Sequence, residues 1–307
     1  RFQWPGETLV HTSLLVKELV NDRLCVCQEH LSNTDHSLPL LQPAIGVGST
    51  FEGWCPFREH EAIYSLLVPL KAPHGYAFHL ELVTTEEMPA KDSRICVELQ
   101  CTRTQEQMLD KNMLCFVHHR EEEITSQRPS LLSTLCTGSY LDVQKIALCF
   151  QDLVRLTWAA LPQWHHYRMN VLPSCRSCNL QLTKASGKPF YVKVMFGVQQ
   201  GDSDIFLSSQ TTDAIFFPST MWPESYAVAQ EKIFRQMARQ APHGSFHREC
   251  LHVCARFVLG TGFSISIMKA VVMHLLVTIS LEKWHRRDFL QRLEDIMYYL
   301  HYCLEEQ

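Results

Sequence analysis

Two short patterns in the first quarter of the chain contain residue types suited to phosphoryl transfer. Gly48-Ser49 forms a turn-prone step, and Glu59-His60-Glu61 follows ten residues later at the start of an apolar run. Carboxylates at positions i and i+2 of a strand point to the same face, where they could hold two Mg²⁺ ions. The backbone N–H groups of a Gly-Ser turn could hold the terminal phosphates of a nucleotide. The patterns supply two of the three parts of a two-metal site, although a Glu-x-Glu beside a turn is more often a solvated strand start.

Two groups of cysteine and histidine residues have spacings that occur in zinc sites. Cys175 and Cys178 are separated by two residues, but no second half of a zinc motif follows at a recognised distance. The second group has helical spacing and consists of His243, His247, Cys250, His252 and Cys254. We expect structural thiols in both places and no bound metal.

The composition is that of a folded globular chain with one large domain or two intimate ones. The 307 residues are 46% hydrophobic, and 28 Lys and Arg residues stand against 32 Asp and Glu residues, for a formal net charge of −4. No run of five like charges occurs, which argues against a nucleic-acid partner and against a polybasic membrane patch. The longest apolar stretch, Ala270 to Leu281, has 12 residues. A bilayer helix needs roughly 20, so we expect no membrane-spanning helix in the printed chain.

Cysteine usage indicates the redox environment. The chain has 13 cysteines, an odd number, and they are scattered through apolar contexts. Disulfide frameworks are typical of shorter secreted chains with denser cysteines. We therefore expect reduced, mostly buried thiols and a domain that faces the cytosol.

The elements that must position these residues are mostly strands in the first two thirds of the chain. A helix expected over Leu9 to Leu31 precedes them. The apolar patterns predict strands at 64–70, 76–82, 95–101, 167–172, 179–183, 189–198 and 204–208. The Pro-His-Gly turn at 73–75 suits a hairpin. A long buried helix is expected over Thr137 to Leu161, with Ser139 and Asp142 resembling a capping pair.

From Pro223 onward the apolar spacing is helical to the end of the chain. The expected fold class is therefore α+β, with a sheet-containing half followed by a helical half. We place the domain boundary at residue 210, so that residues 1–210 hold the sheet with the N-terminal helix and residues 211–307 form a helical lobe.

Several longer motifs are similar to those of a known superfamily. The sequence GSTFEGW at 48–54, the strand end at 67–69 and the helix that WPESY at 222–226 would form resemble the Mab-21 superfamily, whose best-known enzyme is cyclic GMP-AMP synthase. The motifs CTGSYLDV at 136–143 and FGVQQGDSD at 196–204 resemble its inositol trisphosphate receptor-interacting protein-like group, and most closely the like-1 branch of that group. The resemblance covers nearly the whole chain.

The resemblance implies a nucleotidyltransferase-like fold, in which a mixed sheet with flanking helices joins an all-helical C-terminal lobe across a cleft. In catalytic members the Gly-Ser turn holds phosphate and three carboxylates bind the metal ions. Glu59 and Glu61 match the first two carboxylates, whereas the third position falls on Lys193. The vestigial site that the resemblance implies consists of Gly48, Ser49, Glu59, Glu61 and Lys193.

A lysine at the third position should abolish catalysis. The two-metal mechanism needs an acid at this position. An ammonium instead repels each unit of cation charge by roughly 4 kcal/mol at about 4 Å and an effective dielectric of about 20. No Asp or Glu lies between Lys188 and Val198 to replace it. We therefore expect no catalytic residue, no cofactor and no metal, and Lys193 could pair instead with Glu59 or Glu61.

The resemblance further implies a noncatalytic interaction domain of a single-pass membrane protein. The anchor would lie before Arg1, outside the printed chain, and the partner would be a protein such as the inositol trisphosphate receptor. Three alternatives stay open. The domain could bind a nucleotide or inositol phosphate through Ser49 and Lys193 without turnover, it could be a surviving nucleotidyltransferase with Glu98 as the third ligand, or it could be a cell-surface ligand of a receptor, which would require disulfides.

Overall fold

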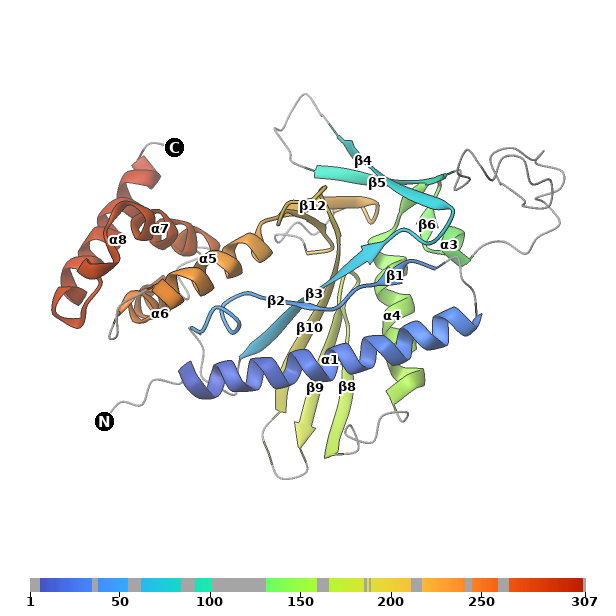
Figure 1. Cartoon of the computed structure of the whole chain (residues 1–307), viewed down its shortest axis with the longest axis horizontal. Helices are drawn as coiled ribbons and strands as arrows, with labels where there is room; N and C mark the ends of the chain where they lie inside the picture. Colours follow the sequence, from blue (N-terminus) through green and yellow to red (C-terminus); the bar gives the residue numbers. More distant parts are fainter. Residues whose placement is uncertain are drawn as a thin grey trace. The chain divides into compact units, whose positions relative to one another are not determined.

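The computed structural model, shown in Figure 1, divides into two compact units. It describes residues 6–34, 38–54, 62–83, 92–100, 131–158, 166–184, 187, 189–210, 217–240, 245–258 and 265–305. Unit 1 comprises Arg1–Leu15, Gly46–Tyr64 and Ala227–Gln307, and unit 2 comprises Val16–Ile45 and Ser65–Tyr226. The division of the chain at residue 210 stays a prediction.

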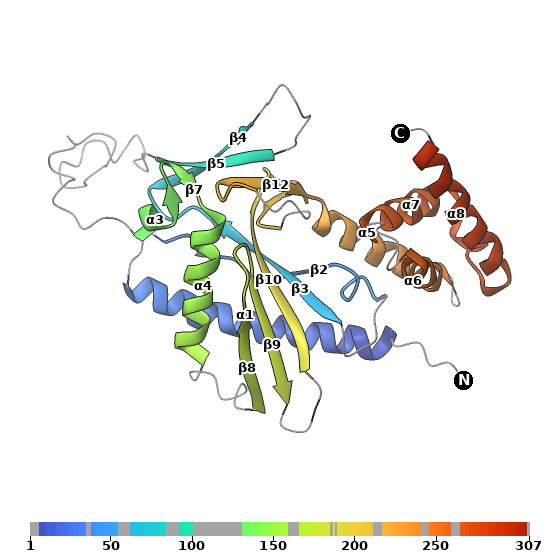
Figure 2. The ribbon, with the colours of Figure 1, turned by 180° about the vertical axis from the view of Figure 1, so that it is seen from behind.

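Within the described residues, twelve strands form one sheet in the order β1-β3-β10-β11-β12-β5-β7-β6. In addition, β2 pairs with β3, β4 with β5, β9 with β10 and β8 with β9. Figure 2 shows β8, β9 and β10 side by side. The strands are β1 Leu40–Leu41, β2 Ile45–Val47, β3 Ile63–Lys71, β4 Tyr76–Leu82, β5 Asp92–Leu99, β6 Cys136–Thr137, β7 Tyr140–Leu141, β8 Tyr167–Leu172, β9 Cys178–Lys184, β10 Pro189–Gln199, β11 Phe206–Ser208 and β12 Met221–Ser225.

Sheet and helices together agree with the expected α+β class, and the nucleotidyltransferase-like assignment stays a prediction. The helices are α1 Gly6–Thr34, α3 Leu131–Thr134, α4 Val143–Thr157, α5 Ala227–Gln240, α6 His247–Val258, α7 Ile265–Thr278 and α8 Phe289–Glu305. Two short 3₁₀ helices, η5 Leu281–Lys283 and η6 Arg286–Asp288, lie between α7 and α8. No described helix combines the length and the apolar content needed to cross a bilayer.

The N-terminus of α4 is held by one buried carboxylate. Asp142 is the N-cap, and its Oδ1 accepts hydrogen bonds from the backbone N–H groups of Gln144 at 2.9 Å and Lys145 at 3.2 Å. Its Oδ2 accepts from the hydroxyls of Thr137 and Ser219, both at 2.7 Å. Burial alone would raise the pKa of Asp142, but these four hydrogen bonds outweigh it and lower the pKa. Of the predicted capping pair, Asp142 is confirmed as the N-cap. Ser139 is not part of the cap, because α4 begins at residue 143 and Ser139 lies in the turn before β7.

The C-terminus of α4 is tied to α1 within unit 2. Arg23 of α1 is buried and donates from Nη2 to the carbonyl oxygen of Trp158 at 3.0 Å. Its Nη1 donates to the carbonyl oxygen of Thr157 and to the hydroxyl of that residue. A cation at these last carbonyls satisfies groups that the helix itself leaves unpaired.

The loop between β8 and β9 is fixed by a buried arginine. The guanidinium of Arg176 donates to the carbonyl oxygens of Ser209 at 3.1 Å, Pro218 at 3.1 Å and Met221 at 2.6 Å. Gln151 of α4 holds the same loop by donating to the carbonyl oxygens of Ser174 and Ser177, both at 2.9 Å. These bonds join α4, the β8–β9 loop and the β11–β12 connection.

Two sequence predictions, the helix at 222–226 and the hairpin turn at 73–75, are wrong. Residues 222–226 do not start a helix, because β12 runs from 221 to 225 and pairs with both β11 and β5. This strand buries Trp222, whose indole N–H donates to the carbonyl oxygen of Leu141 at 3.0 Å, and α5 starts only at Ala227. The turn at 73–75 does not close a hairpin, since β4 pairs with β5 instead of β3.

The arginine in the β8–β9 loop gives the first test. We expect Arg176→Met to lower the free energy of unfolding by about 3 kcal/mol, because the carbonyl oxygens of the buried residues Ser209 and Met221 lose this donor. Urea titrations followed by circular dichroism measure this difference. Arg168→Met, at an exposed position on β8, removes the same charge and should change stability by less than about 0.5 kcal/mol. Equal losses in the two variants would contradict the assignment.

Candidate functional site

Residues 48–54 of unit 1 fold into a compact turn. Gly48 has φ +82°, a left-handed conformation that glycine adopts without steric cost. Its carbonyl oxygen accepts hydrogen bonds from the backbone N–H groups of Phe51 at 3.1 Å and Glu52 at 3.0 Å, and the Ser49 carbonyl oxygen accepts from that of Trp54 at 2.9 Å. The amides of Phe51, Glu52 and Trp54 are therefore used inside the turn, whereas Gly48 and Ser49 take part through their carbonyl oxygens.

The side chain of Glu52 lies fully buried beside this turn. Its Oε1 lies 2.5 Å from the Nζ of Lys269 on α7, and its Oε2 accepts a hydrogen bond from the indole N–H of Trp54 at 2.8 Å. Lys269 is itself only 10% exposed and also donates to the Oε1 of Gln230 on α5 at 3.0 Å. Both oxygens of the carboxylate are thus satisfied by groups from within unit 1.

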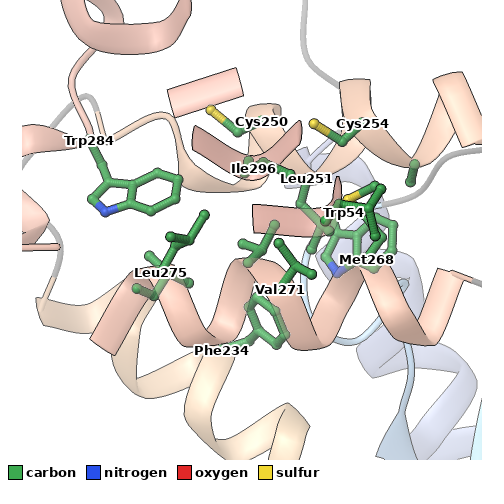
Figure 3. Packing of buried hydrophobic residues seen from close by; sticks show 14 residues of the cluster. Trp54, Phe234, Cys250, Leu251, Cys254, Met268, Val271, Leu275, Trp284 and Ile296 are labelled. Atoms are coloured by element: carbon green, nitrogen blue, oxygen red, sulfur yellow. The ribbon is translucent and has the colours of Figure 1, made fainter. Parts of the chain in front are cut away.

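This network joins the turn to the apolar core of the helical part of unit 1. Figure 3 shows that core, in which Trp54 packs among side chains from α5, α6, α7 and α8. The Lys269 ammonium also lies 5.9 Å from the centre of the buried Phe234 ring. The sequence offers one clue to this arrangement, a single lysine among the apolar residues of 265–278, but it does not indicate the partner.

The ion pair predicts an asymmetric response to mutation. Lys269→Met should lower the free energy of unfolding by about 3–5 kcal/mol, because Glu52 then stays buried without a counter-charge. Adding Glu52→Gln in the same chain should recover most of that loss, since no buried charge is left. Denaturant titrations measure both values, with Lys283→Met at an exposed position of η5 as the matched control. A double variant no more stable than the single one would argue against this pairing.

Lys193 lies on β10 in unit 2, opposite Asn179 of β9. It is half-buried, and burial lowers the pKa of its ammonium. Within the described residues it makes no ion pair and no hydrogen bond, and β10 contains neither Asp nor Glu. Glu59 and Glu61 lie outside the described residues, so the proposed vestigial site and its internal ion pair stay predictions.

Glu98, the alternative third ligand, lies on β5 and is exposed. Its Oε2 is 3.5 Å from the Nε2 of His79 on β4. In the sheet order, β11 and β12 separate β5 from β10, the strand that carries Lys193. The sheet therefore does not bring Glu98 to the strand next to Lys193.

The cysteines of the predicted His and Cys group belong to the helical core. Cys250 and Cys254 of α6 are buried in the apolar cluster shown in Figure 3. Burial raises the pKa of their thiols to about 12 and about 11, respectively. Because zinc is bound by thiolates, protonated core thiols are poor ligands. His252 is half-buried on the same helix, and His243 lies outside the described residues.

Cys175 and Cys178 face different environments. Cys175 is exposed, whereas Cys178 is buried at the start of β9 and its thiol pKa is raised by burial to about 12. Two thiols in such different surroundings do not form half of a zinc site. Among the residues that the structure describes, no three His, Cys, Asp or Glu side chains gather so that they could hold a metal ion.

His247 at the start of α6 is a buried imidazole. Burial, with a smaller contribution from the neighbouring cation of Arg248, lowers its pKa to about 4. Its Nδ1 lies 2.8 Å from the Ser245 hydroxyl, and its Nε2 has no hydrogen-bond partner among the described residues. The folded state therefore holds this histidine in its neutral form.

The lowered pKa of His247 predicts acid sensitivity. Between about pH 6.5 and pH 4 the unfolded chain binds a proton at this residue and the folded chain does not, so stability falls as the pH falls. The loss should reach at most about 3 kcal/mol below pH 4. Urea titrations at several pH values should show a weaker dependence in His247→Asn and an unchanged one in His166→Asn, at an exposed position. Identical pH profiles for His247→Asn and the unmodified chain would refute this role.

Comparison with known proteins finds relatives whose names describe receptor-interacting proteins. No protein-family model matches the chain. The chain is a homologue of the inositol trisphosphate receptor-interacting proteins, as the motifs at 136–143 and 196–204 predict. It is 29% identical over 307 residues to inositol 1,4,5-trisphosphate receptor-interacting protein-like 1 of Rattus norvegicus, an alignment that covers 96% of this chain and 55% of that protein.

More distant relatives bear the same name without the like-1 suffix. Inositol 1,4,5-trisphosphate receptor-interacting protein of Homo sapiens is 24% identical over 302 residues, with 91% of this chain and 54% of the relative covered. The protein of that name in Takifugu rubripes is 24% identical over 283 residues, with 86% and 52% covered. The chain thus spans about half the length of these relatives.

Proposed function

We propose that this chain is a noncatalytic interaction domain with a nucleotidyltransferase-like fold of the Mab-21 type. The observation that carries the proposal is Lys193, a half-buried cation on β10 at the position where the resemblance requires a metal-binding carboxylate. A two-metal site needs anionic oxygens around both ions. An ammonium repels the ions, and a lysine that has lost its proton still supplies no negative charge.

Two further observations favour loss of the chemistry. The amides of Phe51, Glu52 and Trp54 in the turn at 48–54 are already bonded to the carbonyl oxygens of Gly48 and Ser49, so these three are not open to a nucleotide phosphate. Glu98 lies beside His79, and its own strand, β5, is not adjacent to β10. Glu98 is therefore a weak candidate for the third metal ligand. Catalysis would be lost even with both Glu59 and Glu61 at the site, because two carboxylates without the third leave the ligand set of the two metal ions incomplete.

The relatives supply the proposed partner. Their names describe proteins that interact with the inositol 1,4,5-trisphosphate receptor, and we extend that class of partner to this chain. We also propose that the domain is part of a single-pass membrane protein and faces the cytosol. In support of a reducing compartment, the ten described cysteines are free thiols, six of them buried: Cys27, Cys96, Cys136, Cys178, Cys250 and Cys254.

Turnover assays test the loss of catalysis. The chain incubated with the four ribonucleoside triphosphates and Mg²⁺ or Mn²⁺ should give no cyclic or linear oligonucleotide by mass spectrometry, because the third ligand is a cation. The Glu59→Ala variant is the matched control, and its product profile should be the same. Product formed by the unmodified chain and lost in Glu59→Ala would establish an enzyme.

A second candidate is phosphate binding without turnover. It is favoured by Lys193, which has no ion pair or hydrogen bond within the described part of the chain and can act as a point charge for phosphate. Calorimetry with ATP and with inositol trisphosphate separates this candidate from a pure interaction domain. Heat that disappears in Lys193→Met would support a binding site, and no heat at millimolar ligand would remove it.

A further inference from the structure

A groove with a volume of about 650 Å³ runs beside α1 in unit 2. Its walls are the helix between Asn21 and Glu29 and the chain segment from Leu41 to Pro43. The volume falls in the range of sites that bind small molecules or short peptides. None of the residues that line it has a part in the proposed vestigial site.

The two walls of the groove are fixed to each other and to the sheet. The backbone N–H of Leu41 donates to the Oε1 of Gln28 at 2.8 Å, and that of Ala44 donates to the Oδ1 of Asn21 at 2.8 Å. The backbone N–H of Gln42 donates to the carbonyl oxygen of Pro69 on β3 at 2.9 Å. The groove is therefore formed before any ligand arrives, which lowers the entropic cost of binding.

The lining combines apolar and amide groups. Leu24, Leu41 and Pro43 provide apolar surface, and the side chains of Asn21 and Gln42 provide amides that can both donate and accept hydrogen bonds. A peptide offers the same two features, because its backbone pairs with amides and its aliphatic side chains cover apolar surface. The lining therefore suits an extended peptide better than a fully apolar lipid chain.

The charge along this side of α1 is negative. Glu29 is exposed and lies in the groove lining, and Glu18, also exposed, shares its face of the helix at position i−11. The arginine of this stretch, Arg23, is buried on another side, where its guanidinium is bonded to the end of α4. Glu29 is the charged residue of the groove lining, which contains no lysine or arginine, so a ligand in the groove meets a negative charge that favours a cationic side chain.

We propose that this groove binds a short peptide segment of a partner protein in which an aliphatic residue is flanked by Lys or Arg. The aliphatic side chain would lie on Leu24, Leu41 and Pro43, and a basic side chain would face the carboxylate of Glu29. This inference goes beyond the proposed function, because the groove would serve equally in a catalytic or a noncatalytic domain.

Peptide selection tests the groove without a known partner. Random twelve-residue peptides displayed on phage are selected on the immobilised full chain, and the most enriched sequence is synthesised as a free peptide. Its affinity is measured by fluorescence anisotropy for the unmodified chain and for Glu29→Lys. Glu294→Lys, at an exposed position of α8 outside the groove lining, is the control with the same charge change.

The chain also contains its own footprinting probes. Cys25 lines the groove and is exposed, whereas Cys175 is exposed elsewhere in unit 2. Bound peptide should slow the alkylation of Cys25 by iodoacetamide and leave that of Cys175 unchanged, as measured by mass spectrometry of the digested protein. This readout locates the peptide independently of the charge variants.

The proposal predicts enriched peptides with an aliphatic residue between basic ones, affinity at least about threefold weaker for Glu29→Lys, unchanged affinity for Glu294→Lys, and slower alkylation of Cys25. Failure to enrich any peptide would overturn it. Enriched peptides without basic residues, or peptides that bind and leave Cys25 fully reactive, would overturn it as well.

Discussion

A buried carboxylate needs a counter-charge, and in unit 1 the partner of Glu52 comes from 217 positions further along the chain. Lys269 approaches from α7, Gln230 supports it from α5, and Trp54 donates to the second oxygen. Because a desolvated charge tolerates few alternative arrangements, the turn at 48–54 and the two helices are fixed to one another. The conformation of the turn, and with it the use of its amides, follows from this constraint.

In unit 2, buried charges are likewise compensated, but by hydrogen bonds with other groups. Asp142 is surrounded by four donors and Arg176 by three acceptors, so both charges are compensated where they are buried. Lys193 differs, because it is half-buried and has no ion pair or hydrogen bond among the described residues. We propose lost chemistry because this half-buried cation lies on β10, inside the sheet, and has no partner among the described residues.

The periodicity of apolar residues predicted most helices and strands, but it did not predict which residues far apart in the sequence contact each other. The spacing of apolar residues located α1, α4 and β10, since each element buries one face or a continuous run along its own length. The strand β12 was missed because Trp222 and Pro223 were interpreted through a helical pattern that starts only at Ala227. The ion pair of Glu52 was missed because nothing in the sequence joins two residues so far apart.

The candidate site was predicted mainly from a resemblance, and the structure places only part of it. The turn at Gly48 and Ser49 and the strand of Lys193 are described, whereas Glu59 and Glu61 lie outside the described residues. The His and Cys spacings indicated zinc ligands only weakly, and burial of Cys250 and Cys254 shows why spacing is insufficient. Thiols at helical spacing pack in a core as readily as they bind a metal.

We propose that the vestigial site implied by the resemblance cannot hold a pair of divalent ions. Electron paramagnetic resonance of Mn²⁺, titrated into the full chain with a non-hydrolysable nucleoside triphosphate, counts the bound ions directly. The account predicts no bound Mn²⁺ that depends on Glu59 or Glu61, because Lys193 stands where the resemblance places the third acid. Two Mn²⁺ ions per chain in the unmodified protein, both lost in Glu59→Ala, would contradict it.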